Sequence, residues 1–291
     1  MRQQLFEQPS FIPLFKDFGY FAQKNIGITG AEGVLGSIIS KRFTENCINV
    51  IPYDGDVTDN VSLHKWFKKN NFDYFFHFAA IVPVTQVQED PLKAYDVNVI
   101  GTYYICKEII KTQKSCRFFA ASSSHVYKNQ PAEQDSTLNE NSQKEPKTTY
   151  GMTKYVAEQV SIPILDQYKI SYCLGRIFSF ANLLQPETYL VPALRKKIDA
   201  APENGILNII NPDSIRDIMD AETVIDCILH LVVGKFVGVV NIGSGKGMRI
   251  IEIAEHVAKL AGKKIIFKGE NKSTPDSLVA NINLLKNILQ V

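Results

Sequence analysis

Short apolar runs alternate with amphipathic segments over residues 25–178 of the chain. Such runs predict buried strands, and apolar positions that recur at three- and four-residue intervals predict the helices between them. The resulting order, β-α-β-α-β-α-β-α-β, predicts an α/β fold with a doubly wound parallel sheet, right-handed crossovers and ligand sites at the carboxyl ends of the strands. The strands are expected at 26–28, 48–53, 74–78, 118–121 and 171–177, and the helices at 34–43, 60–70, 91–112 and from Tyr150 onward.

The pattern is looser in residues 179–291, which we expect to form mainly a smaller substrate-binding lobe over the strand ends, with some elements returning to the main domain. Residues 1–24 form an N-terminal extension. Its many apolar side chains predict packing on the body of the protein or on a neighbouring subunit. In the lobe, helices are expected at 187–199, 220–233, 249–261 and near 276–290, and strands at 207–210 and 237–242.

Three glycines follow the first predicted strand at three-residue spacing: Gly30, Gly33 and Gly36. Glycine permits positive φ and lets a ligand approach the backbone closely. The helix that follows directs free N–H groups and the positive end of its dipole at that ligand, which suits a pyrophosphate. This arrangement predicts a dinucleotide site and identifies residues 25–178 as an NAD(P)-binding domain of Rossmann type. The alternative interpretation is a glycine-rich turn that binds no ligand.

Composition narrows the class of protein. The 291 residues are 45% hydrophobic and carry a net charge of +2, so neither nucleic acid nor an anionic membrane is an expected partner. Five scattered cysteines without a Cys-x-x-Cys pair predict reduced thiols in a cytoplasmic protein and no metal site. The longest apolar runs are shorter than the roughly 20 residues that span a bilayer.

Candidate chemistry lies at Tyr150 and Lys154, which are four residues apart and therefore share one face of a helix. A free tyrosine is a poor base at neutral pH, and we expect a nearby ammonium to lower its pKa. Lys154 supplies that charge and a contact for a cofactor ribose, while Ser123 supplies a hydroxyl for the substrate oxygen. Together these groups move a proton while a hydride moves to or from nicotinamide. The alternative is a helix surface pair without a role.

These segments together resemble the extended short-chain dehydrogenase/reductase family, whose members are NAD-dependent epimerases and dehydratases of nucleotide sugars. The resemblance spans about 26–266. Thr29-Gly30-Ala31-Glu32-Gly33-Val34-Leu35-Gly36 is similar to the family's glycine loop, Asp56-Val57 to its adenine-contacting pair, and His77-Phe78-Ala79-Ala80 to a strand end. Three later motifs of the family are also matched. The matching segments are Asn98-Val99-Ile100-Gly101-Thr102, Ser122-Ser123-Ser124-His125-Val126-Tyr127 and Tyr150-Gly151-Met152-Thr153-Lys154.

The resemblance implies roles for individual residues. Ser123, Tyr150 and Lys154 are the implied catalytic set, with Ser122 or Ser124 as alternatives for the serine. The implied cofactor contacts are Gly30, Glu32, Gly33, Val34, Leu35, Gly36, Asp54, Asp56, Val57, Phe78, Ala79, Ala80, Asn98, Ser122, Tyr150 and Lys154. The implied substrate contacts are Val82, Ser123, Ser124, Tyr150, Ser179 and Arg216, where Ser179 replaces the usual Asn and Arg216 is a candidate clamp for a diphosphate.

The reaction is less narrowly defined. Family 4,6-dehydratases carry an Asp-Glu pair where this chain has Ser124 and His125, so dehydration is not expected. A sugar epimerase and a 4-keto-sugar reductase remain as the two predictions, and a non-catalytic dinucleotide-binding regulatory subunit is the alternative from another class. His125 is either an acid/base at a sugar carbon or a residue that lines the pocket.

Asp54, at the end of the second predicted strand, favours NAD because a carboxylate accepts from a ribose 2′-hydroxyl and repels a 2′-phosphate. NADP is the alternative, since Lys41 or Arg42 is close enough in sequence to meet that phosphate. The expected partners are a nucleotide sugar and a second copy of the chain in a homodimer.

Overall fold

The structure, a computed structural model, describes residues 5–82, 84–133 and 136–290. Its centre is a parallel six-stranded sheet in the order β10-β6-β4-β3-β1-β2. The predicted α/β class with a doubly wound parallel sheet is therefore confirmed. The strands are β1 (Asn25–Thr29), β2 (Asn49–Tyr53), β3 (Tyr74–His77), β4 (Arg117–Ser123), β6 (Tyr172–Ile177) and β10 (Gly238–Ile242).

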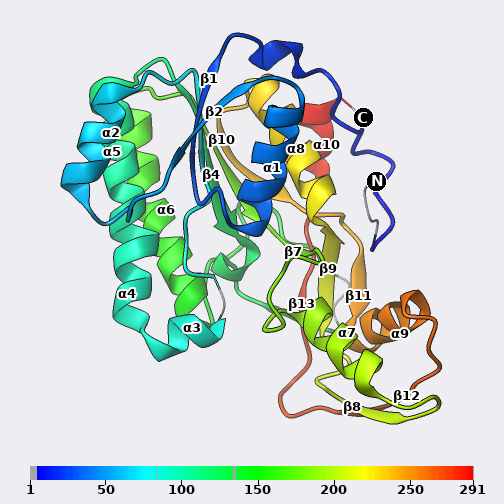
Figure 1. Cartoon of the computed structure of the whole chain (residues 1–291). Helices are drawn as coiled ribbons and strands as arrows, with labels where there is room; N and C mark the ends of the chain where they lie inside the picture. The colour runs from blue at the N-terminus through cyan, green and yellow to red at the C-terminus, as the bar shows by residue number, and fades with distance from the viewer. Residues whose placement is uncertain (1–4, 83, 134–135, 291) are drawn as a thin grey trace.

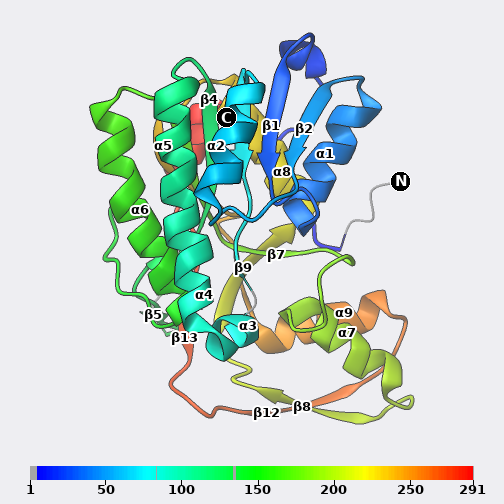
Figure 2. The same cartoon turned by 60° about the vertical axis from the view of Figure 1, so that its left-hand side comes forward.

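Helices cover both faces of this sheet (Figures 1 and 2). One face packs under α2, α5 and α6, and the other under α1, α8 and α10. Each face has its own apolar core, one around Phe67 and Phe75 and the other around Ile26 and Phe43. Their bounds are α1 (Val34–Glu45), α2 (Asn60–Lys69), α5 (Thr102–Thr112), α6 (Thr149–Gln167), α8 (Ala221–Val233) and α10 (Asn283–Leu289).

The segment predicted as one helix over 91–112 is continuous but changes its winding. It begins with α4 (Pro91–Tyr95), passes through a π-helical turn (Asp96–Gly101) and continues as α5. The Asp90 carboxylate caps the start by accepting from the Lys93 N–H at 3.0 Å. A short helix, α3 (Val84–Glu89), precedes it.

The smaller lobe lies below the sheet in Figure 1, beyond the carboxyl ends of its strands. A second sheet runs β11-β9-β13-β5, with β7 added to β9, and β12 pairs with β8. Helices α7 and α9 pack together around Ile198 and Ile253. The bounds are β5 (Gln130–Pro131), β7 (Ser179–Ala181), β8 (Ile206–Ile210), β9 (Ile215–Asp220), β11 (Gly247–Arg249), β12 (Ile266–Glu270), β13 (Asp276–Leu278), α7 (Leu190–Ala200) and α9 (Ile250–Leu260).

The last predicted helix, near 276–290, is wrong in its first part. Residues 276–278 form β13, which pairs with β9 and β5, and only α10 at the end is helical. The reason is tertiary: the Asp276 and Leu278 side chains meet partners from distant strands, and this pairing overrides the local helical pattern. Three elements from beyond residue 178, β10, α8 and α10, lie with the main sheet.

The described part of the N-terminal extension packs on the body of the chain. Phe6 is buried in the core of the lobe, whereas Phe15 and Phe21 are buried against the main domain. The Leu5 and Phe6 N–H groups donate to the Asp220 carboxylate at 2.9 and 3.1 Å. The extension therefore links lobe and main domain. In the described ranges, every helix is too short or too polar to cross a lipid bilayer.

Candidate active site

The glycine loop joins β1 to α1 and lies against the end of β3. Gly30 has φ +71°, and a Cβ there would lie 2.5 Å from the Ala79 backbone nitrogen. A Cβ at Gly36 would lie 2.0 Å from the Gly30 carbonyl oxygen, so both positions exclude a side chain. Gly33 is different, because its Cβ would meet only the Gly30 oxygen at 3.3 Å, and Gly33 lines a cavity. The loop therefore presents bare backbone to that cavity.

This loop fits the pyrophosphate of a dinucleotide. Gly33 is the N-cap of α1 and offers no side chain to its first turn, where Val34 and Leu35 also line the cavity. Uncapped N–H groups at the positive end of a helix bind anionic oxygens. Gly33, Val34 and Leu35 are thus the residues that would hold the pyrophosphate, and Lys154 would meet a ribose.

Tyr150 and Ser123 come together because α6 begins directly against the turn after β4. A Cβ at Gly151 would lie 2.3 Å from the His125 carbonyl oxygen, so this approach requires glycine. Tyr150 and Ser123 are 8% and 5% exposed, and the Ser123 hydroxyl is close enough to the phenol to act on its pKa in the lowering direction. Burial nevertheless raises the pKa of Tyr150 above its ordinary value. The lowered tyrosine pKa expected from the sequence is therefore wrong for this structure, because burial outweighs the effect of Ser123 and the phenol stays protonated.

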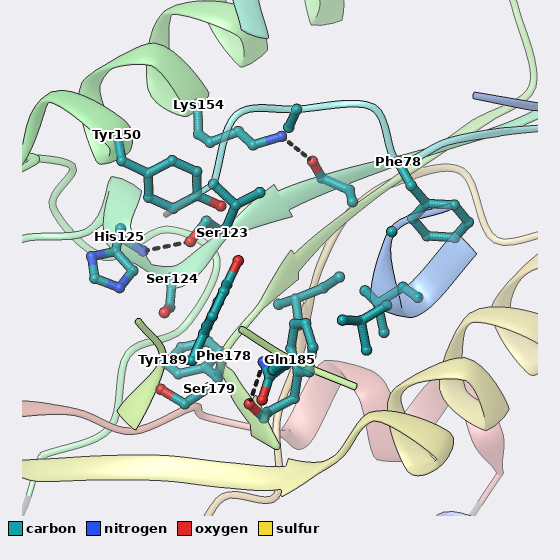
Figure 3. Close-up of a pocket in the computed structure, with 18 of the residues that line it drawn as sticks. Phe78, Ser123, Ser124, His125, Tyr150, Lys154, Phe178, Ser179, Gln185 and Tyr189 are labelled. Atoms are coloured by element: carbon teal, nitrogen blue, oxygen red, sulfur yellow. Dashed lines mark hydrogen bonds between the residues drawn. The ribbon is translucent and has the colours of Figure 1, made fainter. Parts of the chain in front are cut away.

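Lys154 lies one turn further along α6, at the edge of the same cavity (Figure 3). Its Nζ donates to the Ala121 carbonyl oxygen at 2.9 Å. Burial lowers the pKa of Lys154 to about 8, while the Glu158 carboxylate acts in the opposite direction. Glu158 is itself buried and paired with Arg176. Lys154 is thus a cation near neutral pH that titrates within reach of physiological conditions.

His125 contacts the edge of Tyr150, with ring centroids 5.7 Å apart. Its backbone N–H donates to the Ser123 Oγ at 3.2 Å. Burial, together with the positive charge of Arg216, lowers the pKa of His125 to about 4. A neutral imidazole with so low a pKa is a weak base, so the environment favours a pocket-lining role over the acid/base role.

The cavity has a volume of about 450 Å³ and lies between the two parts of the chain. The structure brings together many of the residues proposed from the sequence. Those that line the cavity are Glu32, Gly33, Val34, Leu35, Gly36, Phe78, Ala80, Val82, Ser122, Ser123, Ser124, His125, Tyr150, Lys154 and Ser179.

Other proposed contacts do not line this cavity. The Asn98 amide is engaged by the fold, since it accepts from the Ile81 N–H at 2.8 Å and donates to the Ile81 oxygen and to Thr153. Arg216 forms an ion pair with Asp276 at 2.8 Å. The members of this group are Gly30, Asp54, Asp56, Val57, Ala79, Asn98 and Arg216.

The charged side chains considered for the choice between NAD and NADP differ in their exposure and in their ion pairs. Asp54 is exposed. Arg42, in contrast, is bound by Glu222 and Asp226 of α8, so it is held away from the role of a phosphate ligand. Lys41 is exposed and faces Glu45 at 3.9 Å. Of the groups considered for cofactor choice, Asp54 and Lys41 are thus exposed, whereas Arg42 is engaged within the fold.

Sequence reasoning missed the part of the cavity wall that follows β6. The missed residues belong mainly to one loop and the start of α7, where no family motif was available to mark them. They are Phe178, Phe180, Leu184, Gln185, Pro186, Tyr189, Leu190 and Val191, with Ala121, Ile177 and Ile218 from the strands. The bulky apolar residues between 180 and 191 were the available signal.

Comparison with known proteins gives consistent results. A family model described as GDP-mannose 4,6 dehydratase matches residues 38–286. Among curated proteins, UDP-glucose 4-epimerase of Lactobacillus helveticus is 27% identical over 261 residues, covering 81% of this chain and 77% of the relative. UDP-glucose 4-epimerase of Mycoplasma genitalium is 26% identical over 270 residues, covering 82% and 76%.

Solved structures share the fold. RMD from Pseudomonas aeruginosa, complexed with NADPH, superimposes with a TM-score of 0.81 at 19% identity and covers 92% of each chain. UDP-glucose 4-epimerase of Thermus thermophilus, in complex with NAD, gives a TM-score of 0.79 at 17% identity, covering 90% of this chain and 92% of the other.

Proposed function

Because the chain belongs to the GDP-mannose 4,6-dehydratase family, within the extended short-chain dehydrogenases/reductases that act on nucleotide sugars, we propose that it is an enzyme for NAD(P)-dependent oxidoreduction of a nucleotide-activated sugar. The observation that carries this proposal is one cavity lined by the glycine loop, Ser123, Tyr150 and Lys154. A dinucleotide site and proton-transfer groups that share one cavity suit coupled hydride and proton transfer. When bound, the nicotinamide supplies the hydride acceptor or donor.

Tyr150 is the residue that we propose to exchange a proton with the sugar hydroxyl or carbonyl. As a protonated phenol it is ready to donate to a carbonyl oxygen, while Ser123 holds that oxygen in place. Lys154 adds a positive charge from the same helix face and stabilises negative charge that develops on the phenol. Burial of both side chains keeps water from the transferred proton.

The relatives favour 4-epimerisation over simple reduction. Both curated proteins compared above are UDP-glucose 4-epimerases, and this reaction needs only the Ser/Tyr/Lys set and a dinucleotide. Reduction of a 4-keto sugar uses the same residues and is the alternative. Epimerisation predicts that dinucleotide is retained through purification, since it is regenerated in each cycle, whereas a reductase releases it oxidised.

The test is Tyr150→Phe, which removes one hydroxyl and preserves packing. Turnover on a panel of UDP-, dTDP- and GDP-hexoses should fall by about 10²–10⁴-fold, as expected when a general acid/base is lost. Dinucleotide affinity and thermal stability should change little, and Tyr168→Phe, at an exposed tyrosine beyond α6, is the matched control. Full activity in Tyr150→Phe would overturn the catalytic assignment. A native protein that binds dinucleotide but converts no sugar would instead favour the regulatory subunit.

A cytoplasmic homodimer is the arrangement that we propose for this enzyme. Ile100 and Tyr103, around the start of α5, and Met152 of α6 are exposed apolar side chains on the outer helical layer. Such residues suit a contact between copies of the chain. Light scattering coupled to size exclusion measures the mass directly, and a monomer at micromolar concentration would contradict this proposal.

A further inference from the structure

Tyr189 enters the cavity from the lobe, on the side across from α6. It precedes the first turn of α7 as its N-cap residue and lines the same cavity as Ser123 and Tyr150. Figure 3 shows its hydroxyl directed toward Ser123. Tyr150 lines this cavity from α6, so Tyr189 faces the space in which Ser123 and Tyr150 would hold a substrate.

The Tyr189 hydroxyl forms no hydrogen bond with any residue in the described ranges, and burial raises its pKa. The neighbouring Gln185 is different: its Nε2 donates to the Phe180 oxygen at 3.1 Å, and its Oε1 accepts from the Asn182 N–H at 3.0 Å. The Gln185 amide is therefore engaged in hydrogen bonds within its own loop, whereas the Tyr189 hydroxyl remains available as a donor. The phenol is half-buried and directed into the cavity, so its donor is available to a molecule bound there.

We infer that Tyr189 is a specificity-determining residue that donates a hydrogen bond to the substrate oxygen adjacent to the reacting C–O group. The inference rests on the proposed function, in which Ser123 and Tyr150 take the reacting oxygen. A third hydroxyl that faces the same space from the lobe meets a substituent on the neighbouring carbon. The substrate class is therefore a vicinal diol or its α-hydroxyketone, within the sugar of a nucleotide sugar.

The wall around Tyr189 strengthens this selectivity. Phe178 and Leu190 line the cavity beside it and offer no side-chain hydrogen-bond partner. A sugar without the adjacent hydroxyl would leave the phenol unpaired in an apolar setting, which is unfavourable. Tyr189 belongs to the lobe and Ser123 to β4, so simultaneous contact also holds the sugar between the two parts of the chain.

The experiment compares hexoses with their deoxy analogues. UDP-, dTDP- and GDP-hexoses are each paired with the analogue that lacks the hydroxyl at carbon 3, next to the reacting carbon 4. Affinities are measured by calorimetry with NAD present, for the native protein, Tyr189→Phe and the control Tyr168→Phe. The native protein and the control should prefer the parent sugar by about 2- to 12-fold, the value of one net hydrogen bond.

In Tyr189→Phe this preference should disappear, while NAD affinity stays at the native value. A merely structural role would weaken both sugars equally, so a preference that survives in Tyr189→Phe overturns the inference. If the native protein binds sugar nucleotides but shows no preference, the inference also fails while the proposed function stands. If it binds no sugar nucleotide of the panel, the proposed function fails and the inference fails with it.

Discussion

Replacing Lys154 with methionine should make the protein more stable and less active. Burial lowers the pKa of Lys154 from 10.5 to about 8. Each pKa unit corresponds to about 1.4 kcal/mol, so holding this ammonium costs the folded state about 3 kcal/mol at pH 7. Methionine fills a similar volume without charge, and the lost hydrogen bond to Ala121 offsets about 1–2 kcal/mol of the gain. The free energy of unfolding should therefore rise by about 1–2 kcal/mol.

The pH dependence of this stability gain identifies the burial of the Lys154 charge as its cause. Since the folded-state pKa lies below the unfolded-state value, the unfolded chain binds more protons between about pH 8 and pH 10.5. The cost of burying Lys154 is fully present below pH 8 and disappears as the pH rises through this window. The stability gain of Lys154→Met over the native protein should accordingly be largest at pH 7 and much smaller at pH 10.

The assay is urea unfolding of the native protein, Lys154→Met and a control, Lys111→Met, at pH 7 and pH 10. Lys111 is exposed, so its replacement should change stability by no more than about 0.5 kcal/mol. The buried cysteines and tyrosines also make stability depend on pH. Their contribution is the same in all three proteins, so it cancels when the free energies of unfolding are compared at one pH. Turnover and dinucleotide affinity of Lys154→Met should both fall, because a charge and a ribose contact are lost. A variant that is less stable than the native protein at pH 7 would refute the reasoning.

Three further substitutions test the site. Gly33→Val places a branched side chain where the pyrophosphate binds, so calorimetry should detect no dinucleotide binding by a folded protein; native affinity would contradict the loop assignment. NAD should bind more tightly than NADP, and Asp54→Ala should narrow that difference; tighter NADP binding by the native protein would reverse this prediction. His125→Asn should lower turnover by less than about tenfold, because its neutral imidazole is a weak acid/base. Solvent deuterium that enters the sugar with the native enzyme, but not with His125→Asn, would restore the acid/base role.

The sequence predicted those features that depend on neighbouring residues. Tyr150 and Lys154 share a face because helical spacing requires it, and the Gly30–Gly36 turn follows from glycines between a strand and a helix. The parallel sheet followed from the alternation of elements, since short connections of this kind permit few topologies. The family resemblance then assigned catalytic and binding roles to residues whose function could not be inferred from their spacing alone.

The tertiary structure decided which of these groups share a cavity and which are engaged elsewhere. Arg42 is bound by α8, Arg216 by Asp276, and Tyr189 of the lobe lines the same cavity as Tyr150. The residues brought together in each case are about 40 to 180 positions apart in the chain, and no local periodicity encodes such a distance. The same reason explains β13, where pairing with distant strands prevailed over a helical pattern. The tertiary structure also decided the protonation of the site. Burial raises the pKa of Tyr150 and lowers that of Lys154, and burial is a property of the packed chain.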